Sequence, residues 1–237
     1  GAGRIAQLAR MTRRLCALDG DARPTLEHVQ RAAWSDDGPG LAGLAIPLPD
    51  PVGDDALVTA GPLRDELELL LLRCRARDGL ADGLGASART RYRPGVRALL
   101  VGPSGTGKTL AASVIASERG WPLYRVDLGS LISKYIGETE KNLNVVFSAV
   151  HGRPAVLQFD EADSLFGKRG EIREARDRYA NLEVSHLLAR IEQHDGPCIL
   201  TTNLRGNLDP AFARRFQMVI DFPRPDLAAR SRLWRLH

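Results

Sequence analysis

Eight consecutive residues near the middle of the chain have the types and the order needed to hold a run of phosphate groups. They are Gly102, Pro103, Ser104, Gly105, Thr106, Gly107, Lys108 and Thr109, which follow the pattern G-x-x-x-x-G-K-T. Glycines let the backbone approach phosphate closely, and successive N–H groups add partial positive charge. Lys108 can reach the β- and γ-phosphates of a nucleotide, and the Thr109 hydroxyl can ligate Mg²⁺. This segment, the phosphate loop, predicts binding of a nucleoside triphosphate.

The residues around the phosphate loop place it between a strand and a helix. The apolar run 98–101 is short enough to be a buried strand, and the helix that opens at Leu110 could end at Gly120. Leu110 is included among the nucleotide-binding residues. A glycine-rich turn that matches the pattern by chance is the alternative, and the strand–loop–helix setting argues against it.

A second polar group follows the apolar stretch 155–159, which we expect to be another buried strand. Asp160 and Glu161 stand at its carboxyl end, where parallel sheets bind their ligands. Asp160 would hold Mg²⁺ through its water shell, and Glu161 would orient and polarise the attacking water. A solvated acidic strand end is the alternative, and the phosphate loop upstream disfavours it. Gln158 lies inside this apolar stretch, and the sequence offers no reason for it.

Two further positions could contribute to the same chemistry. Asn203 ends the next apolar strand, where it could hydrogen-bond the γ-phosphate or the attacking water, although a lone asparagine there is more often a turn residue. Arg214 and Arg215 precede another strand. They could be ordinary surface residues, or arginine fingers whose cationic forks stabilise phosphoryl-transfer charge in a neighbouring subunit.

Charge, hydropathy and cysteine content indicate which partners and which cellular setting to expect. The 237 residues carry a net charge of +4, mostly from dispersed arginines, and without a dense basic run interleaved with aromatics we do not expect a nucleic-acid partner. The sequence has no run of 18 apolar residues and no recognisable signal peptide, so no membrane partner is expected. Cys16, Cys74 and Cys198 have neither metal nor disulfide spacing, which indicates a reducing, cytoplasmic setting.

Strands and helices alternate along most of the chain, which predicts an α/β fold. The expected strands are residues 98–101, 123–127, 155–159, 198–201 and 218–222. With helices between them, they predict a three-layer αβα sandwich around a five-stranded, mainly parallel sheet. Two short helices near the N-terminus are too small to form a core alone. We therefore divide the chain into a helical segment (1–37), a linker rich in Gly, Pro and Asp (38–53) and a main domain (54–237).

The order of these motifs resembles the AAA clade of the AAA+ ATPases. The phosphate loop, the acidic strand end and the Asn203 strand are followed by the pattern L-D-x-A-x-x-R-R-F, and the resemblance covers residues 54–237. It implies a P-loop NTPase fold, ATP and Mg²⁺ as cofactors, and ATP hydrolysis. It also implies that Asn203 is the sensor 1 residue. Arg214 and Arg215 would act as fingers in a neighbouring subunit of a homo-oligomeric ring, which we expect to be a hexamer.

The same resemblance implies a substrate-gripping loop. The segment S-K-Y-I-G-E-T-E-K-N is similar to the aromatic–aliphatic–glycine loop that faces the central pore of such ATPases and grips a translocating polypeptide. Tyr135, Ile136 and Gly137 would form it, and tyrosine offers a large amphipathic contact area. The alternative is that Tyr135 and Ile136 are buried supports of the following helix.

A narrower resemblance concerns four segments: S-K-Y-I-G-E-T-E-K-N-L, D-E-A-D-S-L-F-G-K-R, D-R-Y-A-N-L-E-V-S-H-L-L and T-N-L-R-G-N-L-D. They are similar to ATPases found with extracellular contractile injection systems, which carry a degenerate upstream AAA module. Residues 1–37 resemble the helical lid of that module, and 54–237 resemble the large ATPase subdomain of the catalytic module. The lid of the catalytic module is not expected within this chain, so we expect weak ATP binding and slow hydrolysis from it.

These features predict a protein-remodelling or unfolding ATPase motor that acts on a protein substrate as a ring. A nucleotide-gated assembly scaffold of a contractile injection system, with little turnover, is the first alternative. A DNA-remodelling AAA+ protein is the second, and the dispersed positive charge and the lack of a recognisable helix-turn-helix motif argue against it.

Overall fold

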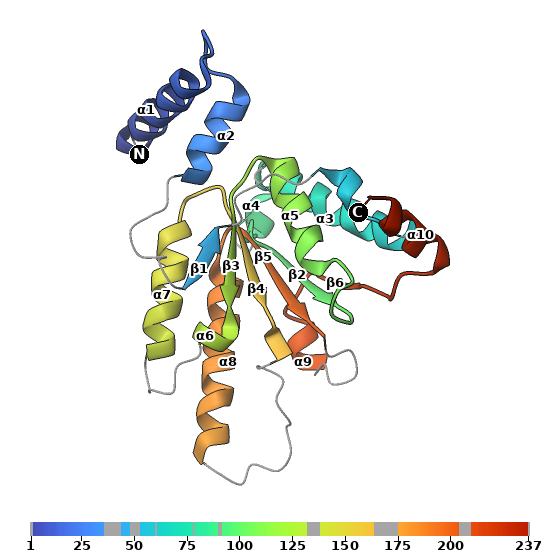
Figure 1. Cartoon of the computed structure of the whole chain (residues 1–237). Coiled ribbons are helices and arrows are strands. Elements are labelled where there is room, and N and C mark those ends of the chain that lie inside the picture. The colour runs from blue at the N-terminus through green and yellow to red at the C-terminus, as the bar shows by residue number, and fades with distance from the viewer. Residues whose placement is uncertain are drawn as a thin grey trace.

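The computed structural model describes residues 2–35, 44–47, 53–59, 61–77, 79–89, 92–131, 138–163, 175–203 and 210–236 (Figure 1). The strands are β1 (Ala45–Pro47), β2 (Val96–Val101), β3 (Leu123–Asp127), β4 (Val156–Asp160), β5 (Pro197–Thr202) and β6 (Met218–Asp221). The α-helices are α1 (Ala2–Asp19), α2 (Leu26–Ser35), α3 (Gly61–Ala76), α4 (Ala86–Arg89), α5 (Lys108–Arg119), α6 (Leu128–Leu131), α7 (Glu138–Val150), α8 (Ala175–Gln193), α9 (Pro210–Ala213) and α10 (Leu227–Leu236). Two 3-10 turns, η1 (Asp54–Ala56) and η2 (Leu80–Gly83), stand before and after α3.

The strands form one sheet in the order β1-β3-β4-β5-β2-β6. The five predicted strands are confirmed, and all of their pairings are parallel. The structure adds a sixth strand, β1, which pairs antiparallel with β3 and lies within the stretch that we expected to be a linker. Its three residues, Ala-Ile-Pro, are too few to show an alternating pattern, and proline is compatible with a strand only at an edge position such as this one.

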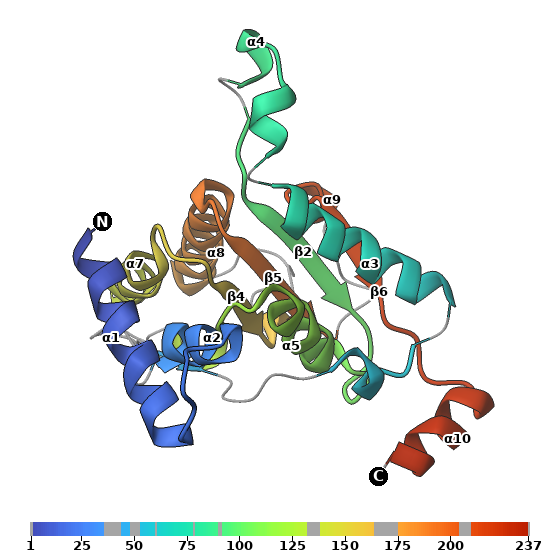
Figure 2. The same ribbon diagram turned by 90° about the horizontal axis from the view of Figure 1, so that it is seen from above.

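Helices cover both faces of the sheet, as predicted for a three-layer sandwich (Figure 2). Alternate residues of each strand point to opposite faces. In β2, Ala98 and Leu100 pack in the core beneath α3 and α5, while Leu99 and Val101 pack in the core with α7 and α8. All four side chains are at most 2% exposed. The central strand is therefore held from both sides, which fixes the loop that leaves its carboxyl end.

The two ends of the chain lie on opposite sides of this sandwich. The α1–α2 hairpin lies on the β1 side and α10 on the β6 side (Figure 1). Within the hairpin, the buried His28 places its Nε2 3.1 Å from Asp19 and 3.4 Å from Asp21. The Thr25 hydroxyl caps α2 by accepting the His28 backbone N–H. No residue of α10 is buried. In the part of the chain that the structure describes, no helix is both long enough and apolar enough to cross a membrane.

Candidate nucleotide-binding and catalytic site

The phosphate loop joins the end of β2 to the start of α5, as the sequence predicts. Gly105 and Gly107 have φ angles of 78° and 94°, a left-handed conformation that disfavours other residues. At Gly102, a Cβ atom would lie 2.2 Å from the carbonyl oxygen of Phe222, so only glycine fits there. The Gly102 N–H also donates to the Thr202 carbonyl at 3.1 Å. The glycines are therefore required both by the loop's backbone and by its close approach to neighbouring strands.

Lys108 connects this loop to the neighbouring strand. Its Nζ donates to the carbonyl oxygens of Gly102 and Pro103 at 2.7 and 2.8 Å, and to Oδ1 of Asn203 at 3.0 Å. The side chain is buried. Burial lowers the pKa of Lys108 from its ordinary value, whereas the nearby Asp163 and Asp160 act in the opposite direction. A buried ammonium group beside strand-end polar groups is well suited to receive a phosphate.

The acidic end of β4 lies beside β5. Asp160 accepts hydrogen bonds from the Thr201 hydroxyl and, at 3.1 Å, from the N–H of Glu161. Both hydrogen bonds are accepted by Oδ1, which orients the carboxylate. Glu161 is exposed and has a φ of 54°, and it is the one non-glycine residue with a positive φ in the described ranges. Such a conformation costs about 1–2 kcal/mol, and residues of this kind cluster at active sites.

Asp163 orients Asn203, a role that the sequence reasoning missed. Its Oδ1 accepts the Asn203 backbone N–H and its Oδ2 accepts the Asn203 side-chain Nδ2–H, both at 2.8 Å. The Thr202 hydroxyl also donates to Asp163. Because Nδ2 faces Asp163, Oδ1 of Asn203 faces Lys108. The signal was present as a second aspartate three residues after Asp160, but nothing in the sequence identified its partner.

Residues 98–224 match the ATPase family associated with various cellular activities (AAA), and this match covers more than half of the chain. The chain belongs to the AAA family. The family match confirms the predicted P-loop fold and identifies the loop–strand arrangement described above as part of an ATPase domain.

Curated relatives agree with this assignment. An uncharacterised AAA family ATPase, y4kL, of Sinorhizobium fredii is 42% identical over 140 residues, which cover 58% of this chain and 42% of the relative. Human vacuolar protein sorting-associated protein 4A is 36% identical over 143 residues, or 59% of this chain and 33% of the relative. The proteasome-activating nucleotidase of Methanococcus vannielii is 36% identical over 146 residues, or 59% and 36%. The chain spans less than half the length of these relatives.

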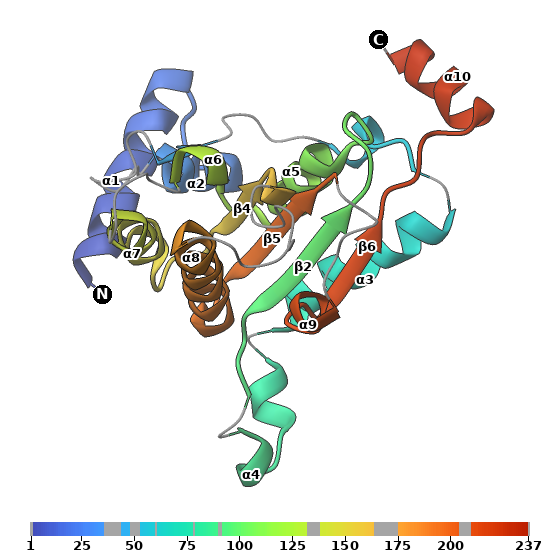
Figure 3. The same cartoon turned by 90° about the horizontal axis from the view of Figure 1, so that it is seen from below.

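Arg214 and Arg215 lie far from the phosphate loop of their own AAA domain. Both are exposed and follow α9, beside the start of β2, where Arg97 Nε donates to the Arg215 carbonyl at 3.2 Å (Figure 3). The phosphate loop leaves the opposite end of β2, so the length of that strand, roughly 20 Å, separates them. Arg215 also forms an ion pair with Glu192 of α8 at 2.9 Å. The structure therefore does not bring these arginines to the loop of the same chain.

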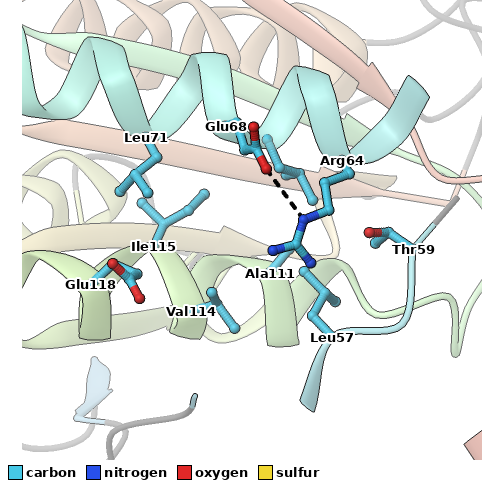
Figure 4. Close-up of a pocket in the computed structure, with 10 residues that line it drawn as sticks. Leu57, Thr59, Arg64, Glu68, Leu71, Ala111, Val114, Ile115 and Glu118 are labelled. Atoms are coloured by element: carbon cyan, nitrogen blue, oxygen red, sulfur yellow. Dashed lines mark hydrogen bonds and ion pairs between the residues drawn. The ribbon is translucent and has the colours of Figure 1, made fainter. Parts of the chain in front are cut away.

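A groove between α3 and α5 lies beside the phosphate loop but contains none of its residues (Figure 4). Leu57, Leu67, Leu71, Ala111, Val114 and Ile115 supply its apolar lining, and Thr59, Arg64, Glu68 and Glu118 supply its polar lining. An ion pair of 3.2 Å joins Arg64 and Glu68, one turn apart on α3, along one wall of the groove. Leu57 also packs near Gly107, because a Cβ atom added to Gly107 would lie 3.4 Å from Cδ1 of Leu57. The groove thus belongs to the packing of α3 on α5.

The predicted pore-loop residues Tyr135, Ile136 and Gly137 lie outside the described residues, between α6 and α7. Their placement at a pore remains a prediction. In the described ranges, no group of three or more His, Cys, Asp or Glu side chains is arranged to hold a metal ion.

Proposed function

We propose that this AAA domain hydrolyses ATP and uses the energy to remodel or unfold protein substrates. The observation that carries this proposal is the 3.0 Å contact between Lys108 Nζ and Asn203 Oδ1. It brings the phosphate loop after β2 to the polar end of the adjacent strand β5, next to the carboxylates after β4. Phosphoryl transfer depends mainly on positioning and on electrostatic stabilisation, which such a convergence of groups supplies.

The residues have distinct roles in this proposal. Backbone N–H groups within residues 102–110, apart from Pro103, which has none, and the Lys108 ammonium would bind the phosphates of ATP. Exposed at the same strand end, Glu161 would orient the attacking water and accept its proton. Asn203, held by Asp163, would contact that water or the γ-phosphate. All of these groups belong to segments that leave the carboxyl ends of β2, β4 and β5, which are neighbours in the sheet.

The described residues also fit Mg²⁺. Gln158 hydrogen-bonds the Thr109 hydroxyl at 3.2 Å, so this hydroxyl lies against β4, two residues before Asp160. A hydroxyl and a carboxylate are the oxygen ligands that Mg²⁺ prefers. Thr109 and Asp160 would hold the ion, Asp160 through water, and bound Mg²⁺ would neutralise charge on the β- and γ-phosphate oxygens.

We further propose a homo-oligomeric ring, expected to be a hexamer, in which Arg214 and Arg215 complete the site of the next subunit. Their distance from the phosphate loop of the same chain supports action in trans, and fingers of this kind can contribute about 10³- to 10⁵-fold in rate. Tyr135, Ile136 and Gly137 would grip the protein substrate in the pore. The vacuolar sorting protein and the proteasome-activating nucleotidase are similar to this chain over 143 and 146 residues.

Steady-state ATPase activity against protein concentration tests this proposal. Specific activity should rise steeply with concentration for the wild type and stay low for Arg215→Ala, which should still bind ATP. Arg232→Ala, a matched change of an exposed arginine on α10, should behave as the wild type. Tight ATP binding with negligible turnover at every concentration would instead favour the nucleotide-gated scaffold.

Several finer assignments belong to the same proposal. The α1–α2 hairpin would be the lid of a degenerate upstream module, 38–53 would connect it to the ATPase subdomain, and the protein would serve a contractile injection system. The three free, buried cysteines agree with a cytoplasmic setting. Deletion of the gene should abolish assembly or function of contractile particles seen by electron microscopy, and unchanged particles would contradict this placement.

A further inference from the structure

Gln158 is a buried polar residue in the middle of the sheet that the proposed chemistry does not use. Its side chain is fully buried, and β4 is paired on both sides, with Arg125 of β3 and Ile199 of β5 opposite this residue. It points to the same face as Val156, toward α5. Burial of an amide is unfavourable unless its polar atoms are hydrogen-bonded. Packing alone therefore does not explain why an amide side chain occupies this position.

The one hydrogen bond that the structure shows for this amide joins it to Thr109, a proposed ligand of Mg²⁺. Nε2 of Gln158 lies 3.2 Å from Oγ1 of Thr109, whereas Oε1 is buried without a partner in the described part of the chain. Thr109 is the first residue after Lys108 in the phosphate loop. The contact therefore spans 49 residues and joins the central strand to the residue whose hydroxyl is proposed to hold Mg²⁺.

The orientation of the amide determines what the Thr109 hydroxyl can offer. When Nε2 donates, one of the two lone pairs of Oγ1 is occupied. When the amide turns by 180°, Oε1 accepts the Thr109 O–H, and both lone pairs of Oγ1 are available to a cation. The two orientations fit the same space, since the nitrogen and oxygen of an amide are nearly identical in size. A hydroxyl whose hydrogen is fixed by an acceptor behind it is the better ligand.

We propose that Gln158 is a positioning residue that orients the Thr109 hydroxyl for Mg²⁺. When the cation is bound, Oε1 of Gln158 accepts a hydrogen bond from the Thr109 O–H. The inference rests on the proposed function of the site, because it assumes that Thr109 is a magnesium ligand. It assigns to β4 a second contribution besides Asp160. An apolar residue at position 158 would support the strand equally well but would leave the hydroxyl unoriented.

Binding of a fluorescent ATP analogue to the 237-residue chain, titrated with Mg²⁺ and repeated in EDTA, tests this role. Gln158→Leu should fold, bind the analogue in EDTA as the wild type does, and need about tenfold more Mg²⁺ for the same enhancement of affinity. Val156→Ala, a packing change on the same face of β4, should leave the Mg²⁺ requirement unchanged. A Gln158→Leu protein with the wild-type Mg²⁺ requirement would overturn the proposal.

A double-mutant cycle separates this inference from the proposed function. In a Thr109→Ala background, Gln158→Leu should have no further effect on the Mg²⁺ requirement, because Gln158 acts through the missing hydroxyl. An additional effect of the same size in that background would also overturn the inference. If the wild-type chain itself showed no Mg²⁺-dependent affinity for the analogue, the result would contradict the proposed function and not only the role of Gln158. Thermal unfolding of each variant verifies that it is folded.

Discussion

Asp163 binds Asn203 through both carboxylate oxygens, one to the backbone N–H and one to the side-chain amide, each at 2.8 Å. This two-point contact fixes the rotamer of Asn203 and turns its Oδ1 toward Lys108. Asparagine side chains can rotate by 180° at little cost unless a neighbour distinguishes the nitrogen from the oxygen. Here the carboxylate does so, because it can only accept.

Asp163→Asn should therefore impair catalysis more than nucleotide binding. The new amide would place an NH₂ group or an oxygen against Asn203 with no fixed preference, so the orientation of Oδ1 would be lost. We expect a fall in kcat of about 10- to 100-fold and a loss of about 1–3 kcal/mol of unfolding free energy. Steady-state kinetics and urea denaturation measure both. Asp65→Asn, on the exposed face of α3, should change neither.

Glu161 gives a prediction that combines stability and activity. At its φ of 54°, alanine is strained and glycine is not, so Glu161→Gly should be more stable than Glu161→Ala by about 0.5–1 kcal/mol. In ordinary helical or extended backbone the order is reversed. Both variants should lose ATP hydrolysis by about 100-fold or more, since both lack the proposed base. Equal stability in urea denaturation would show that the left-handed backbone relaxes in the variants.

His194 should make the stability of the domain dependent on pH in the acidic range. Burial lowers the pKa of His194 from 6.5 to about 4, with Arg77, His151 and Arg190 acting in the same direction and Asp195 opposing. Since the folded state binds the proton less readily than the unfolded state, His194 contributes stability that is complete above pH 6.5. This contribution is lost as the pH falls from 6.5 through about 4.

The size of that loss should be about 3 kcal/mol by the linkage between pKa and stability. His194→Gln should flatten the pH dependence of the unfolding free energy in this range. The rings of His194 and Phe147 pack in a T-shaped arrangement with centroids 5.4 Å apart, so the variant should also be somewhat less stable at neutral pH. His186→Gln, at a partly exposed position, should retain the slope. A slope that persists in His194→Gln would assign it to other groups.

Local patterns in the sequence predicted most of the sheet and the segments that contain the candidate site, and long-range partners account for what they missed. The phosphate loop and the acidic strand end are continuous segments, so their order alone identified them. Gln158 had no explanation because its partner Thr109 lies 49 residues away and is brought to it only by the stacking of α5 on β4. The partner of Asp163 is 40 residues away for the same reason. The strand β1 was missed because three residues contain no periodicity.

The ion pair between Arg215 and Glu192 leads to the last prediction. The 2.9 Å contact with Glu192 occupies one side of the Arg215 guanidinium. If Arg215 acts in a neighbouring subunit, the guanidinium must therefore either leave Glu192 or bind the nucleotide with its other N–H groups. Both side chains are about 40% exposed, so the pair is worth less than about 1 kcal/mol. Glu192→Gln should therefore lower the unfolding free energy only slightly, whereas it should raise ATPase activity at subsaturating protein concentration by making the arginine available. The same change in an Arg215→Ala background should have no effect on activity. Reduced activity of Glu192→Gln in the presence of Arg215 would indicate instead that Glu192 holds the arginine in its working position.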